Sequence, residues 1–510
     1  MTKLLKKIFS RTSITALLIV IQVVWLVALL LELSSALPVI QSILRVLSVV
    51  AILFVIRSEM NPSYKIGWVL LISILPLLGG LMFVIFGNKR PTRYMRKMLN
   101  AQLEKSSAYF KERPSVSDEI ALKDPAAAGL FKYLEKAGGY PAGRDTKISY
   151  YRVGEEMFED LICELEKAEK FIFLEYFIIS PGRMWDSVLE ILKRKASEGV
   201  DVRVIYDDMG CIDRLPANYC NTLRSWGIKT MAFNRFVPAV SLVMNNRDHR
   251  KLTVIDGKTG FTGGINISDE YINEIERFGH WKDTAVQLRG SAVRSLTRMF
   301  LQQWTLLAGP QALKRPEEEY LCSFPVPAQG FVQPYADTPL DSYNVAESAY
   351  LHLVQRSNRY VYITTPYLIL DNEFVTSLKT AAESGVDVRI ITPSHPDKWY
   401  VHMVSRSYYQ TLIQSGVKIY EYQPGFIHAK MFLCDDQLAV VGTANLDYRS
   451  LYLHFENAVL LYHCPVIADI RQDFADTLEK SRLITLEELR SKLRGTKLLC
   501  ALLKLLAPLM

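Results

Sequence analysis

Three long apolar runs open the chain, at residues 14–33, 37–56 and 67–86. Each run has the length of a helix that crosses a bilayer, although Arg45 interrupts the second. A lysine-rich start precedes the first run, but no small-residue cleavage site precedes the next one. The pattern therefore favours an anchor over a cleaved signal peptide. The sequence predicts an N-terminal membrane anchor over residues 1–90, with two or three apolar helices.

Basic residues set the expected orientation of this anchor. Five of them, with no acidic residue, follow the third run between Lys89 and Lys97, and lysines also precede the first run. Basic flanks of this kind favour the cytoplasmic side, and an even number of membrane crossings places both of them there. Because Arg45 is costly at mid-bilayer, we expect the 37–56 run to be a re-entrant or interfacial helix, with three true spans as the alternative. The chain is thus expected to be a multi-pass cell-membrane protein with cytoplasmic catalytic domains.

Beyond residue 90 the pattern changes to that of a duplicated α/β protein. Residues 91–140 are predicted to be a polar helical connector. Apolar strands alternate with amphipathic helices over residues 141–308 and again over 341–484, and a proline-rich connection covers 309–340. We expect two similar domains, each a helix-covered β-sheet. The C-terminal segment 485–510 is amphipathic and predicts either a helix on the bilayer, which we favour, or a terminal helix packed on the enzyme.

The two halves also match in sequence. Residues 196–203 correspond to 382–389, and residues 222–229 correspond to 411–418. The spacing is that of a whole-domain duplication rather than of a short solenoid repeat.

Each half carries one copy of a His-x-Lys-x4-Asp motif followed by a small-residue turn and an asparagine. A single match is weak evidence, but two matches with the same tail are not chance. A simpler interpretation is that the chain has two repeats whose motif histidines and lysines are ordinary surface residues. This explains the duplication, but it does not explain why His, Lys, Asp and Asn keep the same spacing in both copies. The candidate catalytic residues are therefore the six motif positions His249, Lys251, Asp256, His428, Lys430 and Asp435.

The residue types in this motif suit phosphate chemistry. A histidine and a lysine two apart on a strand share a face, and lysine and asparagine donors suit an anionic oxygen. Asn266 and Asn445 are therefore candidate phosphate-binding residues. An imidazole nucleophile needs an orienting carboxylate on its other nitrogen, and Asp283 and Glu456 occupy matching places for that role. The motif aspartates are expected to cap a turn or pair with backbone rather than touch substrate.

Composition excludes several classes of protein. The seven cysteines are scattered, without a Cys-x-x-Cys pair, which argues against a disulfide framework and a zinc site. We expect no metal and no other cofactor. The net charge of +7 favours an anionic partner, either nucleic acid or an anionic membrane surface. The apolar runs favour the membrane, so no nucleic acid is expected.

These motifs resemble those of the phospholipase D superfamily, and within it the bacterial cardiolipin synthases. The resemblance is close around Asn246–Lys251 and Gly442–Ser450 and covers most of the chain. Two departures are visible: Asp248 and His454 stand where the family is expected to have Asn. The resemblance implies an active site between the two halves, without a metal.

The resemblance also implies a mechanism. His249 would attack a phosphodiester and form a phosphohistidine, and His428 would act as acid and base. The lysines and asparagines would hold the phosphate oxygens. The donor and the acceptor would both be phosphatidylglycerol, which gives cardiolipin and glycerol.

Two alternatives stay open at this stage. A membrane-anchored phospholipase D or nuclease would use water or another alcohol, but the basic and aromatic interleaving of a nuclease groove is missing near the motifs. A non-catalytic scaffold would be expected to lose one motif, and both are intact. Glu175, a charge on an otherwise apolar strand, would need a partner if buried and is a further candidate for orienting a catalytic group.

Overall fold

The computed structural model describes residues 38–58, 60–74, 115–235, 246–309, 312–313, 316–492 and 497–505, with residue 507 and isolated positions between 79 and 104. The chain divides into two compact units. One comprises residues 1–90 with 236–245, and the other comprises 91–235 with 246–508, apart from single residues at the C-terminus.

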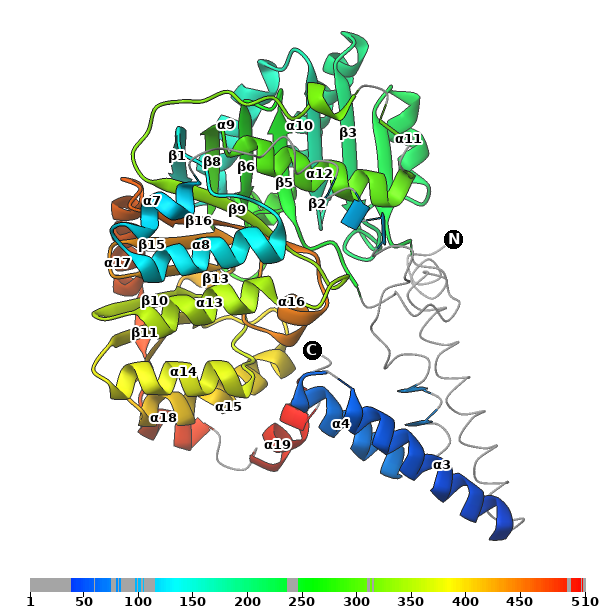
Figure 1. The fold of residues 1–510 in the computed structure, drawn as a ribbon, viewed down its shortest axis with the longest axis vertical. Helices are drawn as coiled ribbons and strands as arrows, with labels where there is room; N and C mark the ends of the chain where they lie inside the picture. Colours follow the sequence, from blue (N-terminus) through cyan, green and yellow to red (C-terminus); the bar gives the residue numbers. More distant parts are fainter. Residues whose placement is uncertain are drawn as a thin grey trace. The chain divides into compact units, whose positions relative to one another are not determined.

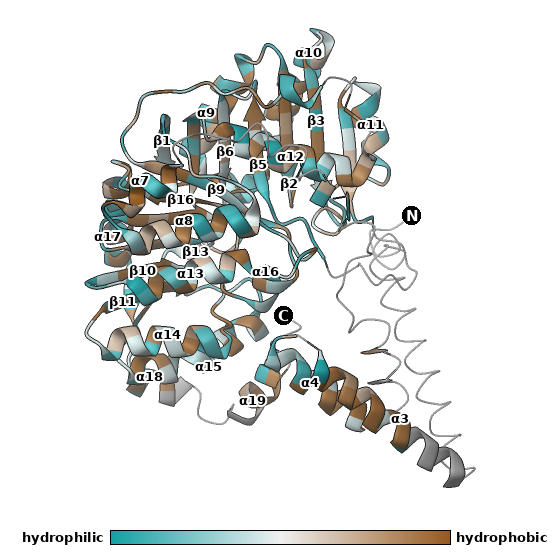
Figure 2. Ribbon diagram, viewed as in Figure 1, coloured by the Kyte–Doolittle hydropathy of each residue, from teal (hydrophilic) through white to brown (hydrophobic). Residues whose placement is uncertain are grey.

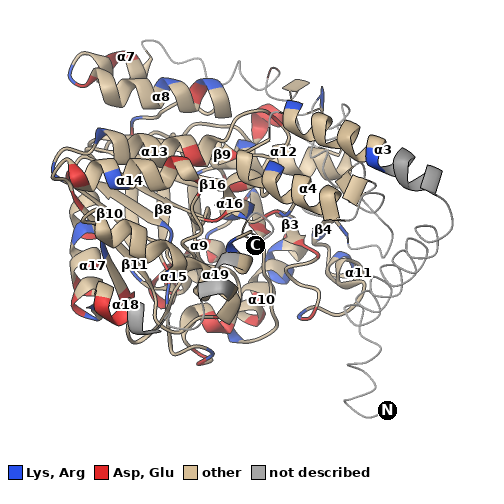
Figure 3. Cartoon of the chain, turned by 90° about the horizontal axis from the view of Figure 1, so that it is seen from below, with Lys and Arg blue, Asp and Glu red and all other residues tan. Residues whose placement is uncertain are grey.

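The N-terminal unit contains two described helices, α3 (Pro38–Arg57) and α4 (Pro62–Ile74). Both are largely apolar (Figure 2) and carry few charges (Figure 3). The predicted 37–56 run thus forms α3, with Arg45 inside it, whereas the 14–33 run lies outside the described residues. Among the described residues, none of the helices combines the length and the apolarity that a bilayer crossing requires.

The first half of the larger unit is built on a seven-stranded mixed sheet (Figure 1). Its central pair β2–β3 is parallel, and β2 pairs antiparallel with β5, the strand that follows the first motif histidine. All positions of these three strands are buried, and most of them are apolar. In spatial order the strands are β1 (Thr146–Tyr151), β8 (Ala285–Gly290), β6 (Thr259–Gly263), β5 (Lys251–Ile255), β2 (Phe171–Tyr176), β3 (Asp201–Asp207) and β4 (Lys229–Phe233).

Helices cover both faces of this sheet. On one face α9 (Gly154–Glu166), α10 (Arg183–Ser197) and α11 (Tyr219–Ser225) bury apolar stripes against the strands. On the other face lies α12 (Val293–Ala308), whose Phe300 ring stacks on Phe173 of β2 at 4.4 Å between centroids. The short 3-10 helix Asp269–Ile272 lies between β6 and β7 (His280–Lys282).

The second half repeats this topology in an eight-stranded sheet. Its central strands β10, β11 and β14 correspond to β2, β3 and β5 of the first sheet, and they pair in the same senses. In spatial order the strands are β17 (Ser481–Leu483), β12 (Lys418–Tyr422), β11 (Asp387–Pro393), β10 (Tyr360–Thr364), β14 (Met431–Cys434), β15 (Leu438–Gly442), β16 (Glu456–Tyr462) and β9 (Phe331–Asp337). The expected pair of α/β domains is therefore confirmed.

Strand β9 lies inside the stretch 309–340 that was predicted to be a connection. It pairs antiparallel with β16 at the edge of the second sheet, with Pro334 opposite Val459. An edge strand tolerates proline, because one side of its backbone needs no ladder partner. The proline-rich composition therefore marks an edge strand as well as a linker.

Helices of the second half continue the correspondence. The helices α13 (Val345–Arg356), α14 (Asn372–Glu383), α15 (Trp399–Gln414) and α17 (Ile467–Glu479) follow the order of α9 to α12. Between β15 and β16 lies the short helix α16 (Tyr448–Tyr452).

The predicted polar connector contributes α7 (Val116–Ala121) and α8 (Pro125–Gly138). Helices α8, α13 and α14 lie one beside the next (Figure 1). Tyr133 of α8 donates a hydrogen bond to Ser348 of α13 at 2.9 Å. The end of this segment is thus part of the second half rather than a free link.

The predicted C-terminal segment forms α18 (Leu486–Lys492) and α19 (Lys497–Leu505). Helix α19 contacts α15, with the Lys504 ammonium 4.1 Å from the Tyr408 ring centre, and it leaves Leu499 and Leu502 exposed. One face of this amphipathic helix therefore packs on the enzyme, and the other carries exposed leucines.

The two halves share a core and a small sheet. One apolar cluster runs continuously from α12 and the first sheet to β14, β15, β16 and α17. Strand β7 (His280–Lys282) of the first half pairs in parallel with β13 (Gly425–Ile427) of the second. The backbones approach so closely here that a Cβ on Gly425 would collide with the His280 backbone. This contact fixes the relative position of the two motifs.

Candidate active site

Each motif histidine is paired with a carboxylate from the other half of the protein. Nδ1 of His249 lies 2.9 Å from Oε1 of Glu456, and Nδ1 of His428 lies 2.6 Å from Oδ2 of Asp283. All four side chains are buried. An ionised carboxylate only accepts, so Nδ1 carries the proton in both pairs and Nε2 keeps its lone pair.

Backbone pairing between the halves creates this crossed arrangement. The His249 N–H donates to the Phe455 carbonyl at 2.9 Å, and the His428 N–H donates to the Lys282 carbonyl at 2.7 Å. Each histidine is therefore hydrogen-bonded to the residue that directly precedes the carboxylate of the other half. The carboxylate, one residue further along, is placed within reach of the imidazole.

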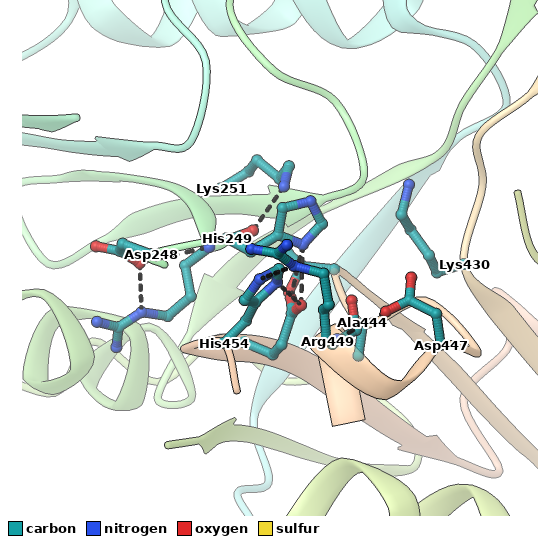
Figure 4. Close-up of polar contacts among 12 residues, drawn as sticks. Asp248, His249, Lys251, Lys430, Ala444, Asp447, Arg449 and His454 are labelled. Carbon is teal, nitrogen blue, oxygen red and sulfur yellow. Dashed lines mark hydrogen bonds and ion pairs between the residues drawn. The ribbon is translucent and has the colours of Figure 1, made fainter. Parts of the chain in front are cut away.

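The motif lysines lie on the same face as the histidines, as expected for alternate residues of an extended segment. Lys251 donates to the carbonyl of His249 at 2.6 Å, and Lys430 donates to the carbonyl of His428. Lys430 also lies 2.7 Å from Nδ1 of its histidine. Each motif imidazole therefore has a lysine beside it in the buried site, and Figure 4 shows Lys251, Lys430 and His249 in this region.

Burial controls the protonation of the imidazoles. It lowers the pKa of His249 to about 3, against the opposing charge of Glu456, and the pKa of His428 to about 4. Burial raises the pKa of Glu456, but His249 and the hydrogen bonds to its carboxylate lower it further, so its pKa lies well below the usual range. At neutral pH the free site therefore holds neutral imidazoles beside anionic carboxylates, the protonation state that a nitrogen nucleophile requires.

The pKa values of the two motif lysines lie close to neutral pH. Burial lowers the pKa of Lys251 to about 7 and that of Lys430 to about 8. A bound phosphate would favour their charged forms, because an anion at close range offsets the cost of desolvation. The site is therefore electrostatically prepared for an anionic group.

The two carboxylates have different surroundings. Glu456 accepts a hydrogen bond from the Thr443 hydroxyl, and the next residue, Asn457, donates to Thr262 of the first half at 2.7 Å. Gly264 occupies the position of Thr443 in the first half, and a Cβ there would collide with the Asp283 carboxylate. The near-symmetric site therefore has a hydroxyl beside Glu456 on one side, whereas on the other side the Asp283 carboxylate lies directly against Gly264.

The motif aspartates cap the start of a neighbouring strand. Asp256 accepts hydrogen bonds from the N–H groups of residues 169–171 at 2.7–2.9 Å, and Asp435 accepts from residues 358–360 at 2.8–2.9 Å. Both have positive φ, at 54° and 53°. Their carboxylates hold backbone together, so we assign them a structural role within the motif rather than contact with substrate.

The two asparagines differ in their freedom. Asn266 accepts from the Ile178 N–H at 2.9 Å and donates to the Tyr271 hydroxyl at 2.7 Å, which leaves one N–H for a ligand. Asn445 is buried, its side chain hydrogen-bonds Asp447, and its Oδ1 has no hydrogen-bond partner among the described residues. Both asparagines therefore keep an N–H donor for a phosphate oxygen, and Asn445 also has an unused Oδ1.

Aromatic side chains hold the imidazoles in place. The Phe177 ring lies 5.0 Å from that of His249, and Tyr271 and Trp281 lie 5.6 and 5.4 Å from that of His428. These contacts restrict the rotation of the imidazoles and contribute to the apolar surroundings that lower their pKa values.

Glu175 does not reach a catalytic side chain. It is fully buried on β2 and pairs with Arg250 at 2.8 Å, while Arg250 also contacts Asp248 at 3.2 Å. Gln303 of α12 donates to the second oxygen of Asp248 at 3.1 Å. This polar network anchors the segment that carries His249 and Lys251, so Glu175 acts through the backbone of the motif.

His454, one of the two departures from the family pattern, lies next to the first pair. Its ring centre is 5.6 Å from that of His249, and its Nδ1 is 3.7 Å from Glu456 Oε1. Ligand atoms of His249, His454 and Glu456 lie within 4.8 Å of one another, close enough to hold a metal ion. A metal there would replace the hydrogen bond that orients His249. Sequence spacing missed this group, because His249 is remote in sequence from the other two.

The arrangement can perform nucleophilic phosphoryl transfer. One imidazole can attack a phosphorus atom, the second can exchange a proton with the leaving and entering oxygens, and the lysines can stabilise the charge that develops on the phosphate. The fold and the site define a phospholipase D-like enzyme.

Comparisons with known proteins agree with this class. A family model described as "Cardiolipin synthase, PLD-like domain" matches residues 161–300 and 350–478, and one described as "Phospholipase_D-nuclease N-terminal" matches 46–88. A crystal structure of phosphatidylserine synthase from Haemophilus influenzae has the same fold, with a TM-score of 0.57 and 15% identity, over 74% of this chain and 100% of that chain.

Relatives with similar sequences extend along almost the whole chain. The cardiolipin synthase of Geobacillus kaustophilus is 35% identical over 477 residues, which are 92% of this chain and 93% of that protein. Cardiolipin synthase 2 of Bacillus anthracis is 34% identical over 456 residues, 88% of this chain and 87% of that protein. An uncharacterized protein of Streptococcus mutans is 43% identical over 465 residues, 90% and 99% of the two chains. The chain belongs to the cardiolipin synthase family with phospholipase D-like domains.

Several residues of the site could not be recognised from the sequence. Thr443, Asn457 and Phe177 support the His249–Glu456 pair, but each resembles an ordinary strand or turn residue in sequence. The difference between Thr443 and Gly264 at matching positions of the duplicated motif was a usable signal.

Proposed function

We propose that this protein is a cardiolipin synthase that transfers a phosphatidyl group from one phosphatidylglycerol to another. The observation that carries the proposal is the pair of His–carboxylate contacts formed across the two halves, with the lysines beside them. Because relatives over most of the chain are named cardiolipin synthases, a lipid hydroxyl is the expected acceptor.

The reaction then proceeds in two steps on the described residues. When the anionic donor binds, His428 takes up a proton from solvent on Nε2. Nε2 of His249 then attacks the phosphorus of the donor, a phosphatidyl–histidine bond forms, and the leaving glycerol oxygen takes the Nε2 proton of His428. Asp283 and the bound phosphate stabilise the imidazolium form of His428. His428 then removes the proton from the glycerol hydroxyl of the second phosphatidylglycerol, which attacks the phosphorus and releases cardiolipin. Lys251, Lys430, Asn266 and Asn445 bind the phosphate oxygens in both steps.

The lipid substrate implies that the protein is membrane-associated. We assign the anchor to residues 1–90, with the catalytic unit facing the cytoplasm, on the apolar runs and on the basic cluster between Lys89 and Lys97. A reporter fused after residue 510 tests this orientation. Fluorescence of a green fluorescent protein fusion without activity of an alkaline phosphatase fusion is expected, and the reverse result contradicts the assignment.

The activity is tested by incubating the purified protein with vesicles of phosphatidylglycerol alone. Cardiolipin and glycerol should appear in equal amounts, and the His249→Ala protein should form neither. Phosphatidic acid as the main product would identify a phospholipase D that uses water instead.

A further inference from the structure

A third cation lies beside the active site, in addition to Lys251 and Lys430. Arg449 is in α16, which is capped by the Asp447 side chain. Its Nε lies 3.4 Å from Nε2 of His454, whose ring is 5.6 Å from that of His249. The side chain extends from α16 toward His249 (Figure 4).

Arg449 is available to an external anion. Within the part of the chain that the structure describes, no carboxylate pairs with it, and its contact is with an imidazole. The side chain is only partly buried. By contrast, Arg250 pairs with Glu175 and Arg406 pairs with Glu421, each at 2.8 Å. A partly buried guanidinium beside a phosphate site, without a protein carboxylate as its partner, is well suited to bind a phosphate with two N–H donors.

The cation is present on one side of the site only. Counting from Asn445 and Asn266, Glu270 takes the place of Arg449 in the first half. Glu270 is neutralised within the protein by Arg214 at 2.8 Å and by Arg277 at 3.4 Å. The duplicated halves supply equivalent His and Lys pairs, so a cation that breaks their symmetry is not needed for the transferred phosphate.

The proposed reaction brings one more phosphate to the site. The donor carries the phosphate that is transferred, and the acceptor phosphatidylglycerol carries another. In the product a three-carbon glycerol bridge separates the two phosphates, so the second phosphate must lie near the first. We propose that Arg449 binds the phosphodiester of the acceptor lipid, an inference that rests on the proposed function. Arg449 then selects an anionic lipid alcohol over water or a neutral alcohol.

The test compares two acceptors in one reaction. Wild-type and Arg449→Gln proteins are incubated with phosphatidylglycerol vesicles and excess ethanol, and cardiolipin, phosphatidylethanol and released glycerol are measured. Loss of a charge-assisted contact should lower the ratio of cardiolipin to phosphatidylethanol about 10- to 100-fold. Glycerol release with ethanol as acceptor should persist, because the first step does not use the acceptor phosphate. Arg449→Lys should give an intermediate ratio.

The control is Arg471→Gln, which removes an exposed arginine that pairs with Asp436 at 3.1 Å. It should leave the product ratio unchanged. Equal loss of both products in Arg449→Gln would show that Arg449 acts through His454 on the chemistry and would overturn the proposal, as would an unchanged ratio. A wild-type protein that makes phosphatidylethanol but no cardiolipin would overturn the proposed function as well, so the two failures are distinguishable.

Discussion

Glu456 accepts a hydrogen bond from Nδ1 of His249 at 2.9 Å, although 207 residues separate the two in sequence. The contact leaves Nε2 of His249 free to react. Asp283 of the first half likewise accepts a hydrogen bond from Nδ1 of His428 of the second half. Neither half therefore holds a complete catalytic pair. The active site therefore exists only when both halves are docked.

Replacement of either orienting carboxylate by its amide should stop the reaction. In Glu456→Gln the new side chain can donate to Nδ1, which moves the imidazole proton to Nε2 and removes the nucleophilic lone pair. We expect turnover with phosphatidylglycerol to fall about 10³- to 10⁴-fold for Glu456→Gln and for Asp283→Asn. Circular dichroism should show that both proteins are folded. Near-wild-type turnover in either variant would contradict the crossed pairing.

The two histidines should act as one unit. His249→Ala and His428→Ala should each lower turnover by about 10⁴-fold or more, and the double variant should be hardly worse than either single one. Loss of one imidazole already prevents the cycle, because the remaining imidazole cannot be both nucleophile and acid. Losses that multiply in the double variant would indicate that the residues act independently.

Gly264→Ala should inactivate the enzyme without a change in any charged group. A Cβ at this position collides with the Asp283 carboxylate, so Asp283 has to move away from His428. Gly129→Ala is the matched control, because a Cβ there meets no atom within 4 Å and the residue lies within helix α8. The control should keep full activity and equal or greater thermal stability. Full activity of Gly264→Ala would show that the position of Asp283 does not matter.

The rate should fall as the pH rises through the titration of the lysines. Burial lowers the pKa of Lys251 to about 7 and of Lys430 to about 8, so the charged forms that bind phosphate are lost above these values. The ratio kcat/KM reports the free enzyme and should therefore decline between about pH 7 and pH 9. Bound substrate stabilises the ammonium groups, so kcat should decline at a higher pH. A kcat/KM profile that stays flat to pH 10 would contradict the low lysine pKa values.

The sequence predicted the parts of this protein that depend on local pattern. The duplicated α/β halves follow from alternating apolar strands and amphipathic helices, and the catalytic residues follow from a motif that occurs twice. The sequence predicts an apolar strand over residues 171–179 that contains Glu175, and the structure has β2 over Phe171–Tyr176. Glu175 within it was correctly expected to need a partner, and Arg250 is that partner.

Contacts between distant segments could not be read from local pattern. The crossed pairs depend on β7 and β13, two strands of three residues each, which are too short to give a periodic signal. Strand β9 was hidden by its proline, because an edge position was not foreseeable from composition. The importance of Arg449 appears only when α16 is seen beside His454.

The covalent intermediate is the most direct test of the mechanism. Phosphatidylglycerol labelled in its phosphate is mixed with the enzyme, the reaction is quenched during turnover, and the protein is digested. The account predicts an acid-labile, base-stable label on the peptide that contains His249, formed in step with glycerol release and before cardiolipin appears. Label on the peptide that contains His428 would reverse the two roles. Absence of labelled protein, together with cardiolipin of inverted configuration at phosphorus, would show direct transfer between the two lipids and contradict the phosphohistidine mechanism.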